Sequence, residues 1–176
     1  FGSSAIAGTI NIITKEPVRN SASISHTTTS IGGSSALHNT TDINASIVSE
    51  DNKLGLAIFG QNTSKDAWDA NGDGFTELSR ISGQTAGFRG YIKTGLFSKI
   101  TAEYHHLEEF RRGGDNLDLP PHEAMIAEQT DHSINTGGVK YDWYAPNEKH
   151  MFNAFGSVQH INRESYYGAG KDPNAY

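Results

Sequence analysis

The stretch that decides the fold is residues 37–48, LHNTTDINASIV, in which the side chains alternate in character one by one. One parity carries Leu37, Thr41, Ile43, Ala45 and Ile47, and the other carries His38, Thr40, Asp42, Asn44 and Ser46. Successive side chains of a β-strand point to opposite faces, so a period of two predicts a strand with one apolar and one polar side. We therefore expect residues 37–48 to lie between an apolar environment and water.

The same period recurs along the chain, and no stretch of comparable length keeps apolar residues at helical spacing. In 99–106 the residues Ile100, Ala102 and Tyr104 alternate with charged or polar ones, whereas 53–60 is apolar on both parities, which leaves its facing open. Alternation over several segments predicts an all-β, antiparallel protein.

The composition excludes several classes of protein. The chain has 176 residues, 19% of them charged, a formal net charge of −6 and no cysteine. It has no run approaching the roughly 18 to 20 apolar residues of a membrane-spanning helix, no disulfide framework and no basic surface of the kind that binds nucleic acid. A membrane β-barrel stays open, because alternating strands average out as polar.

The connections between the expected strands are short and long in turn. Three of the connections are short, namely 49–52, 94–98 and 145–148. Two are long and polar, namely 65–78 and 111–128. The connection 31–36 is an exception, because it is short where the alternation of short and long connections requires a long one. Tight turns at one end and long loops at the other are typical of an outer-membrane barrel. The alternative is a soluble β-sandwich, whose strands are usually shorter, at about 5 to 6 residues.

The first residues carry a family resemblance. Residues 1–17, FGSSAIAGTINIITKEP, resemble the end of the plug domain of TonB-dependent outer-membrane receptors, a segment of the form YGS-x-A-hydrophobic-G-G-hydrophobic-I-N-I-x-T-K. The matching residues are Gly2, Ser3, Ala5, Ile6, Gly8, Ile10, Asn11, Ile12, Thr14 and Lys15. Phe1, Ala7 and Thr9 depart mildly from that pattern. The rest of the chain looks like Bacteroidetes-type members of the family.

The resemblance implies a domain organisation. Residues 1–17 would be the C-terminal end of the plug, and 18–176 would be the N-terminal part of a transmembrane β-barrel of roughly 22 strands. Because the chain opens on Phe1 without a signal peptide and stops at KDPNAY, we expect it to be a piece of a longer protein. The expected strands are 21–31, 36–49, 53–64, 79–94, 98–110, 129–144 and 149–165.

The resemblance also implies a function. Such a protein lies in the outer membrane of a Gram-negative bacterium and takes up a scarce nutrient, such as an iron-siderophore complex, haem or cobalamin. Its partners would be the TonB energy-transducing complex, that small-molecule ligand and membrane lipid, with no nucleic acid. It would require no cofactor and would not be an enzyme, and no catalytic motif stands in the sequence. The alternative function is a soluble, carbohydrate-binding all-β module with a structural calcium loop.

One loop has calcium-like spacing. In DANGDGFTE, residues 69–77, the candidate ligands are Asp69, Asn71, Asp73, Phe75 through its carbonyl, and Glu77. This is the first half of an EF-hand pattern, but Arg80 stands where the bidentate Glu belongs, so a regular EF-hand is excluded. The sequence predicts either an irregular Ca²⁺ site or a loop whose Asp, Asn and Gly residues serve turns.

Charged residues also gather around the second long loop. Arg111, Arg112, His122, Glu123, Asp131 and His132 are candidates for contacting a polar or anionic ligand, with the arginines as forked donors. The alternative is that they are ordinary lumen and loop side chains. Separately, Tyr141, Trp143, Tyr144 and Phe152 are candidates for an aromatic girdle at a membrane interface, or for core aromatics.

Overall fold

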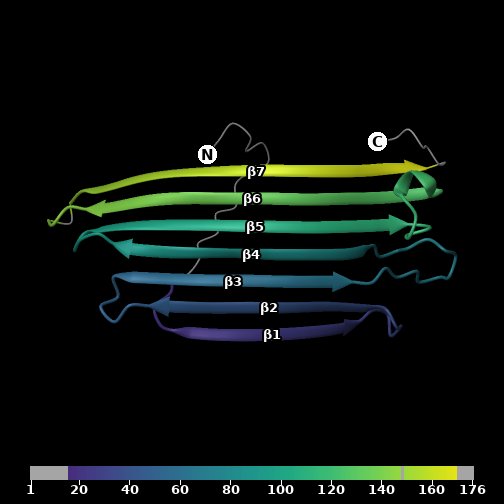
Figure 1. Cartoon of the computed structure of the whole chain (residues 1–176), viewed down its shortest axis with the longest axis horizontal. Helices are drawn as coiled ribbons and strands as arrows, with labels where there is room; N and C mark the ends of the chain where they lie inside the picture. The colour runs from purple at the N-terminus through teal and green to yellow at the C-terminus, as the bar shows by residue number, and fades with distance from the viewer. Residues whose placement is uncertain (1–15, 148, 170–176) are drawn as a thin grey trace.

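The fold is one antiparallel β-sheet of seven strands, arranged in chain order from β1 to β7 (Figure 1). The computed structural model describes residues 16–147 and 149–169. The strands are β1 (Ser21–Ser30), β2 (Leu37–Val48), β3 (Leu54–Lys65), β4 (Arg80–Lys93), β5 (Ser98–Gly114), β6 (Ile126–Tyr144) and β7 (Met151–Ala169). The one helical element among the described residues is a 3₁₀ turn, η1 (Pro121–Glu123).

The all-β, antiparallel prediction is confirmed, and the strands are close to those expected. The main difference is at the second long loop, where β5 continues to Gly114 and β6 begins at Ile126. The backbone N–H of Asp115 donates to the Ile126 carbonyl, so the pairing runs on past the end of the apolar alternation. Backbone hydrogen bonds between strands form whatever the side chains are, so the side-chain alternation predicted shorter strands for this hairpin than the structure shows.

The connections fall into two groups at the two ends of the sheet. Figure 1 shows the links β2–β3, β4–β5 and β6–β7 at one end, which we call the turn end, and the links β1–β2, β3–β4 and β5–β6 at the other, the loop end. The two long loops both lie at the loop end. There Trp68 forms an isolated bridge with Leu78, and its ring covers Gly32, whose φ of 58° and closeness to that ring both favour glycine.

Every strand pair is in continuous register, so the two faces of the sheet can be assigned residue by residue. Ala45, Ile58, Phe88 and Tyr104 follow one another across β2 to β5 and define what we call the apolar face. The opposite side is the polar face. In β3, Leu54, Leu56 and Ile58 lie on the apolar face, which settles the facing that the sequence left open.

Large apolar side chains are exposed in a band on the apolar face. They are Ile24, Leu37, Ile43, Ile47, Leu54, Leu56, Ile58, Phe88, Ile92, Tyr104, Val139, Trp143, Phe152 and Val158. On the polar face, the exposed large apolar residues of the described strands are confined to β6 and β7. The charged residues of the apolar face, such as Arg80, Glu108 and Asp131, lie toward the loop end.

The sheet is a single layer without a hydrophobic core. The buried apolar residues among those described are Tyr91, Ala124, Ala127 and Ala145, together with Pro17 and Pro121. The accessible surface is 12216 Å², whereas a compact monomer of this mass exposes about 8,400 Å². The sheet is open, with β1 and β7 as its edges. No helix within 16–147 and 149–169 is long and apolar enough to cross a membrane.

The motif that carries the family resemblance lies outside the described residues. It comprises Gly2, Ser3, Ala5, Gly8, Asn11, Ile12 and Thr14. The two domains expected from it, 1–17 and 18–176, therefore stay a prediction.

Candidate functional site

A group of charged side chains lies on the polar face near the loop end. Arg111 Nε donates to Glu109 Oε1 at 2.7 Å, and its Nη2 donates to the other carboxylate oxygen at 3.3 Å. His132 is the cross-strand partner of Glu109, with Nδ1 4.0 Å from that carboxylate, and Arg163 is the next partner along the row. Because Arg111 is only half-buried and fork-shaped, this group can contact a polar or anionic ligand.

The two predicted arginines are not brought together. Arg112 is fully buried, and its guanidinium donates to the backbone carbonyls of Gly113, Asp115 and Asn116. Neighbouring residues of a strand point to opposite faces, so Arg111 and Arg112 diverge. Arg112 therefore holds the start of the β5–β6 loop in place.

The remaining predicted ligand residues are dispersed. His122 and Glu123 lie in η1, where His122 Nε2 is 3.8 Å from Glu123 Oε1, and the His122 side chain is mostly buried. Asp131 lies on the apolar face, opposite to its neighbour His132. A depression of about 340 Å³ at this end is lined by Glu109, Asp131 and His132, together with residues of β4. Of the six predicted residues, only Arg111 and His132 thus share the polar-face group.

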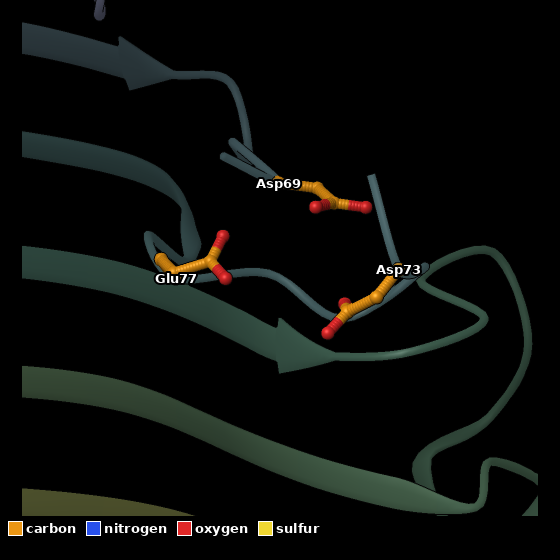
Figure 2. A group of neighbouring side chains, drawn as sticks. All are labelled: Asp69, Asp73 and Glu77. Carbon is orange, nitrogen blue, oxygen red and sulfur yellow. The ribbon is translucent and has the colours of Figure 1, made fainter. Parts of the chain in front are cut away.

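The calcium-like loop brings three carboxylates together. The ligand atoms of Asp69, Asp73 and Glu77 lie within 4.8 Å of one another, and Figure 2 shows the three side chains extending toward a common space. The carboxylates come from the loop between β3 and β4, and all are at least partly exposed. This arrangement has the donor chemistry of a Ca²⁺ site.

The same carboxylates also serve the loop itself. Asp69 accepts from the backbone N–H groups of Gly72 and Gly74, at 2.6 and 2.8 Å, and Glu77 accepts from that of Ala70. The bond from Gly74 is the main reason why the pKa of Asp69 is lowered. Each oxygen keeps a second lone pair, so turn formation and cation binding are compatible. The two predictions for this loop therefore both stand.

A second polar network lies on the polar face nearer the turn end, and the sequence did not single it out. It consists of three ion pairs: Arg89–Glu103 at 2.9 Å, Lys99–Glu16 at 2.6 Å and Lys140–Asp142 at 2.8 Å. Asp142 is almost fully buried. The alternation in 99–106 predicts that Lys99 and Glu103 lie on the same face of their strand. Which charged residues form ion pairs follows only from the register between the strands.

The predicted aromatic girdle is split between the faces. Trp143 and Phe152 are cross-strand partners on the apolar face at the turn end, and Tyr141 lies one step further from the turn on the same face. Tyr144 lies on the polar face. Three of the four aromatic residues thus lie on the apolar face near the turn end, and two of them, Trp143 and Phe152, belong to the apolar band.

Comparison of the chain with protein-family models, with curated proteins and with solved structures finds no match. The structure by itself defines a single-layer, two-faced antiparallel β-sheet with a charged group on its polar face.

Proposed function

We propose that this chain is part of the wall of an outer-membrane β-barrel receptor of the TonB-dependent kind. The observation that carries the proposal is the band of exposed apolar side chains, which crosses the apolar face from Ile24 in β1 to Val158 in β7, whereas such residues on the polar face of the described strands are confined to β6 and β7. Water would not favour such a surface on a free protein. A lipid bilayer covers this kind of surface, and the opposite face then lines an aqueous lumen.

The connections give the proposed wall an orientation. Short periplasmic turns and long external loops are usual in these barrels. The turn end, where Trp143 and Phe152 form the last cross-strand pair of the apolar band, would lie at the periplasmic interface. The loop end, with the carboxylate loop and the Arg111 group, would lie outside. This orientation places the charged group where an external ligand arrives first.

The proposed ligand is a scarce nutrient with polar or anionic groups, such as an iron-siderophore complex, haem or cobalamin. Arg111, His132 and Arg163 supply cationic or hydrogen-bonding groups on the lumen side of β5 to β7. Uptake would draw energy from the TonB complex through the plug. Growth rescue and uptake assays with the whole receptor identify the ligand, with Arg111→Ala as the variant that weakens uptake.

The soluble alternative finds less support. A carbohydrate-binding sandwich buries the apolar face of one sheet against a second sheet. The described residues form one layer, and their apolar face is exposed. A bilayer supplies the missing cover without a second sheet.

A pair of substitutions in β2 tests the proposal. Ala45 lies on the apolar face, and its neighbour Asn44 lies on the polar face. Lysine at position 45 would face acyl chains and cost about 2 to 4 kcal/mol near the bilayer midplane, whereas Asn44→Lys places the same charge in water. In the full-length protein, we expect Ala45→Lys to reduce the folded, membrane-inserted fraction and Asn44→Lys to leave it close to wild type.

Two results would overturn the proposal. One is equal folding of the two lysine variants in the membrane. The other is recovery of the full-length protein in the aqueous phase without detergent.

A further inference from the structure

The apolar face has a hollow at the place where the apolar band ends toward the loop end. Gly60 of β3 and Ala86 of β4 are cross-strand partners on that face, between Ile43 in β2 and His106 in β5. Because Gly60 has no side chain and Ala86 has only a methyl group, the surface sinks between the two larger neighbours. The hollow has a volume of about 380 Å³.

The packing of the strands does not require glycine at position 60. A Cβ there would lie 3.6 Å from the nearest atom, the backbone carbonyl oxygen of Thr85, which is an ordinary van der Waals contact. Gly60 also lacks the positive φ that favours glycine. A larger residue would therefore fit at position 60, and it would fill the hollow.

The two ends of the hollow differ in chemistry. Toward the turn end, the next pair of cross-strand partners is Ile58 and Phe88, whose side chains are 50% and 40% exposed. Toward the loop end, the next pair is Asn62 and Gln84. A molecule that fits the hollow thus needs an apolar part on one side and a hydrogen-bonding part on the other.

The amide pair has unused hydrogen-bonding capacity. Asn62 and Gln84 are exposed, and neither side chain forms a hydrogen bond within the part of the chain that the structure describes. In the same row of partners, His26 Nδ1 and Thr41 Oγ1 lie 2.8 Å apart and satisfy each other. The Cβ atoms of cross-strand partners are about 4.5 to 5.5 Å apart. The two amides can therefore donate to a single carbonyl group.

The charges around the hollow favour an uncharged group. The described residues that line it include no Lys, Arg, Asp or Glu. His106 has partners of its own, since its Nε2 lies 3.3 Å from Glu108 Oε1 and its Nδ1 lies 2.9 Å from Asn135 Oδ1. The carboxylate of Glu108 repels an anion, so a phosphate finds no partner here, whereas a carbonyl oxygen finds two amide donors.

We propose that the hollow binds one acyl lipid of the outer leaflet by its linkage carbonyl, with the acyl chain lying over Ile58 and Phe88. This inference rests on the proposed function, because a barrel wall brings the apolar face against lipid. The column from Gly60 to Leu54 covers six residues, about 20 Å along the strand. That length exceeds half of the roughly 30 Å hydrocarbon core, so it accommodates a chain of one leaflet.

Two lipids that differ only in their linkage test the carbonyl contact. Delipidated full-length protein is titrated with ester-linked diacyl phosphatidylcholine or with its dialkyl ether analogue, and native mass spectrometry gives the apparent Kd of the first bound lipid. We expect the ester lipid to bind about fivefold more tightly, which corresponds to one neutral hydrogen bond. Equal affinities for the two lipids would overturn the proposal.

Matched amide variants locate the contact. Asn62→Leu and Gln84→Met remove the amide groups at similar size, and each should reduce the preference for the ester lipid. Asn162→Leu is the control, because Asn162 lies in the same row of the apolar face but in β7, outside the hollow. The control should keep the wild-type preference. A preference that survives in both amide variants, or that falls equally in the control, would contradict the assignment.

Filling the hollow is an independent test. Gly60→Val and Ala86→Leu should each weaken binding of the ester lipid to the level of the ether analogue. Gly156→Val adds the same side chain on the same face, where nothing lies within 4 Å, and should leave binding unchanged. The two filling variants lie in different strands, so one decides if the other fails to fold. Wild-type affinity in a folded filling variant would overturn the proposal.

The outcome also separates this inference from the proposed function. If the lipid tests fail while Ala45→Lys still lowers the membrane-inserted fraction relative to Asn44→Lys, the hollow is not a lipid site and the barrel wall stands. If the two lysine variants insert equally, the barrel wall itself is wrong.

Discussion

Arg111 and Arg112 are adjacent in β5, yet they lie on opposite faces of the sheet. The guanidinium group of Arg111 binds a side-chain carboxylate, whereas that of Arg112 binds backbone carbonyls. Arg111 is half-exposed, at 51% of its side-chain surface, and donates two hydrogen bonds to the carboxylate of Glu109. Arg112 is 1% exposed and binds three backbone carbonyls. One arginine is available to a ligand, and the other is part of the loop structure.

Removing the buried arginine should cost stability. Arg112→Ala leaves the carbonyls of Gly113, Asp115 and Asn116 without their charged donor, and we expect the free energy of unfolding to fall by about 1.5 to 3 kcal/mol. Arg111→Ala should change it by no more than about 0.5 kcal/mol, because the lost ion pair is exposed. Urea unfolding of the full-length protein in detergent or lipid measures both. A larger loss for Arg111→Ala would contradict the assignment.

Calcium should stabilise the carboxylate loop if the loop binds it. The expected result is a Ca²⁺-dependent rise in the melting temperature of the wild-type protein, absent in the double variant Asp69→Ala, Asp73→Ala. Asp118→Ala is the control, because it removes an exposed loop carboxylate that pairs with Arg80 outside the cluster. No shift in the wild type would mean that these residues serve turns only.

The β2–β3 turn should show a pH dependence at low pH. The Ser49 hydroxyl, then the Lys53 backbone N–H and ammonium group, lower the pKa of Asp51 from 3.8 to about 2. Since the folded-state pKa lies below the unfolded one, the stabilisation is complete above 3.8 and is lost as the pH falls toward 2. Carbon NMR titration of the Asp51 carboxyl should give this low pKa, and Ser49→Ala should raise it. An ordinary value in the wild type would contradict the turn geometry.

Gly87 should tolerate no side chain. A Cβ there would lie 2.5 Å from the ring of Phe59 and 2.5 Å from the Tyr104 carbonyl oxygen, and the latter belongs to the backbone and cannot turn aside. We expect Gly87→Ala to lower the free energy of unfolding by about 1 to 3 kcal/mol through overpacking. Gly156→Ala, which meets nothing within 4 Å, should be close to neutral in the same urea titration. Equal stability of the two variants would contradict the close packing of the Phe59 ring from β3 and the Tyr104 carbonyl from β5 against Gly87 of β4.

The 176-residue chain on its own should not unfold cooperatively in aqueous solution. Within the described residues its sheet is one open layer, and the outer sides of the edge strands β1 and β7 have no neighbouring strand, which invites edge-to-edge association. We expect aggregation or a broad transition in calorimetry. A sharp, concentration-independent melt of a monomer would show that the sheet is stable without cover.

The strands could be predicted from the sequence because the pleat imposes its period on each segment separately. Residues 37–48 show this best, since their alternation matches the two faces of β2. Features that depend on pairing between strands could not be predicted. The facing of 53–60, which is apolar on both parities, follows only from its register with β4.

The candidate site was harder to predict for the same reason. Its residue types were visible in the sequence, but the burial of Arg112 depends on a loop that folds back over the strand end. The ion pair between Glu16 and Lys99 joins positions 83 residues apart. Nothing local in the sequence connects them.

The unbroken register of the six strand pairs has a consequence for how this protein can change over generations. None of the pairs contains a bulge, from Ser21 opposite Ser46 to Tyr144 opposite Met151. Inserting or deleting one residue within a strand would exchange its apolar and polar sides from that point on. Length variation should therefore accumulate in the long loops at one end, while the strands diverge by substitution only.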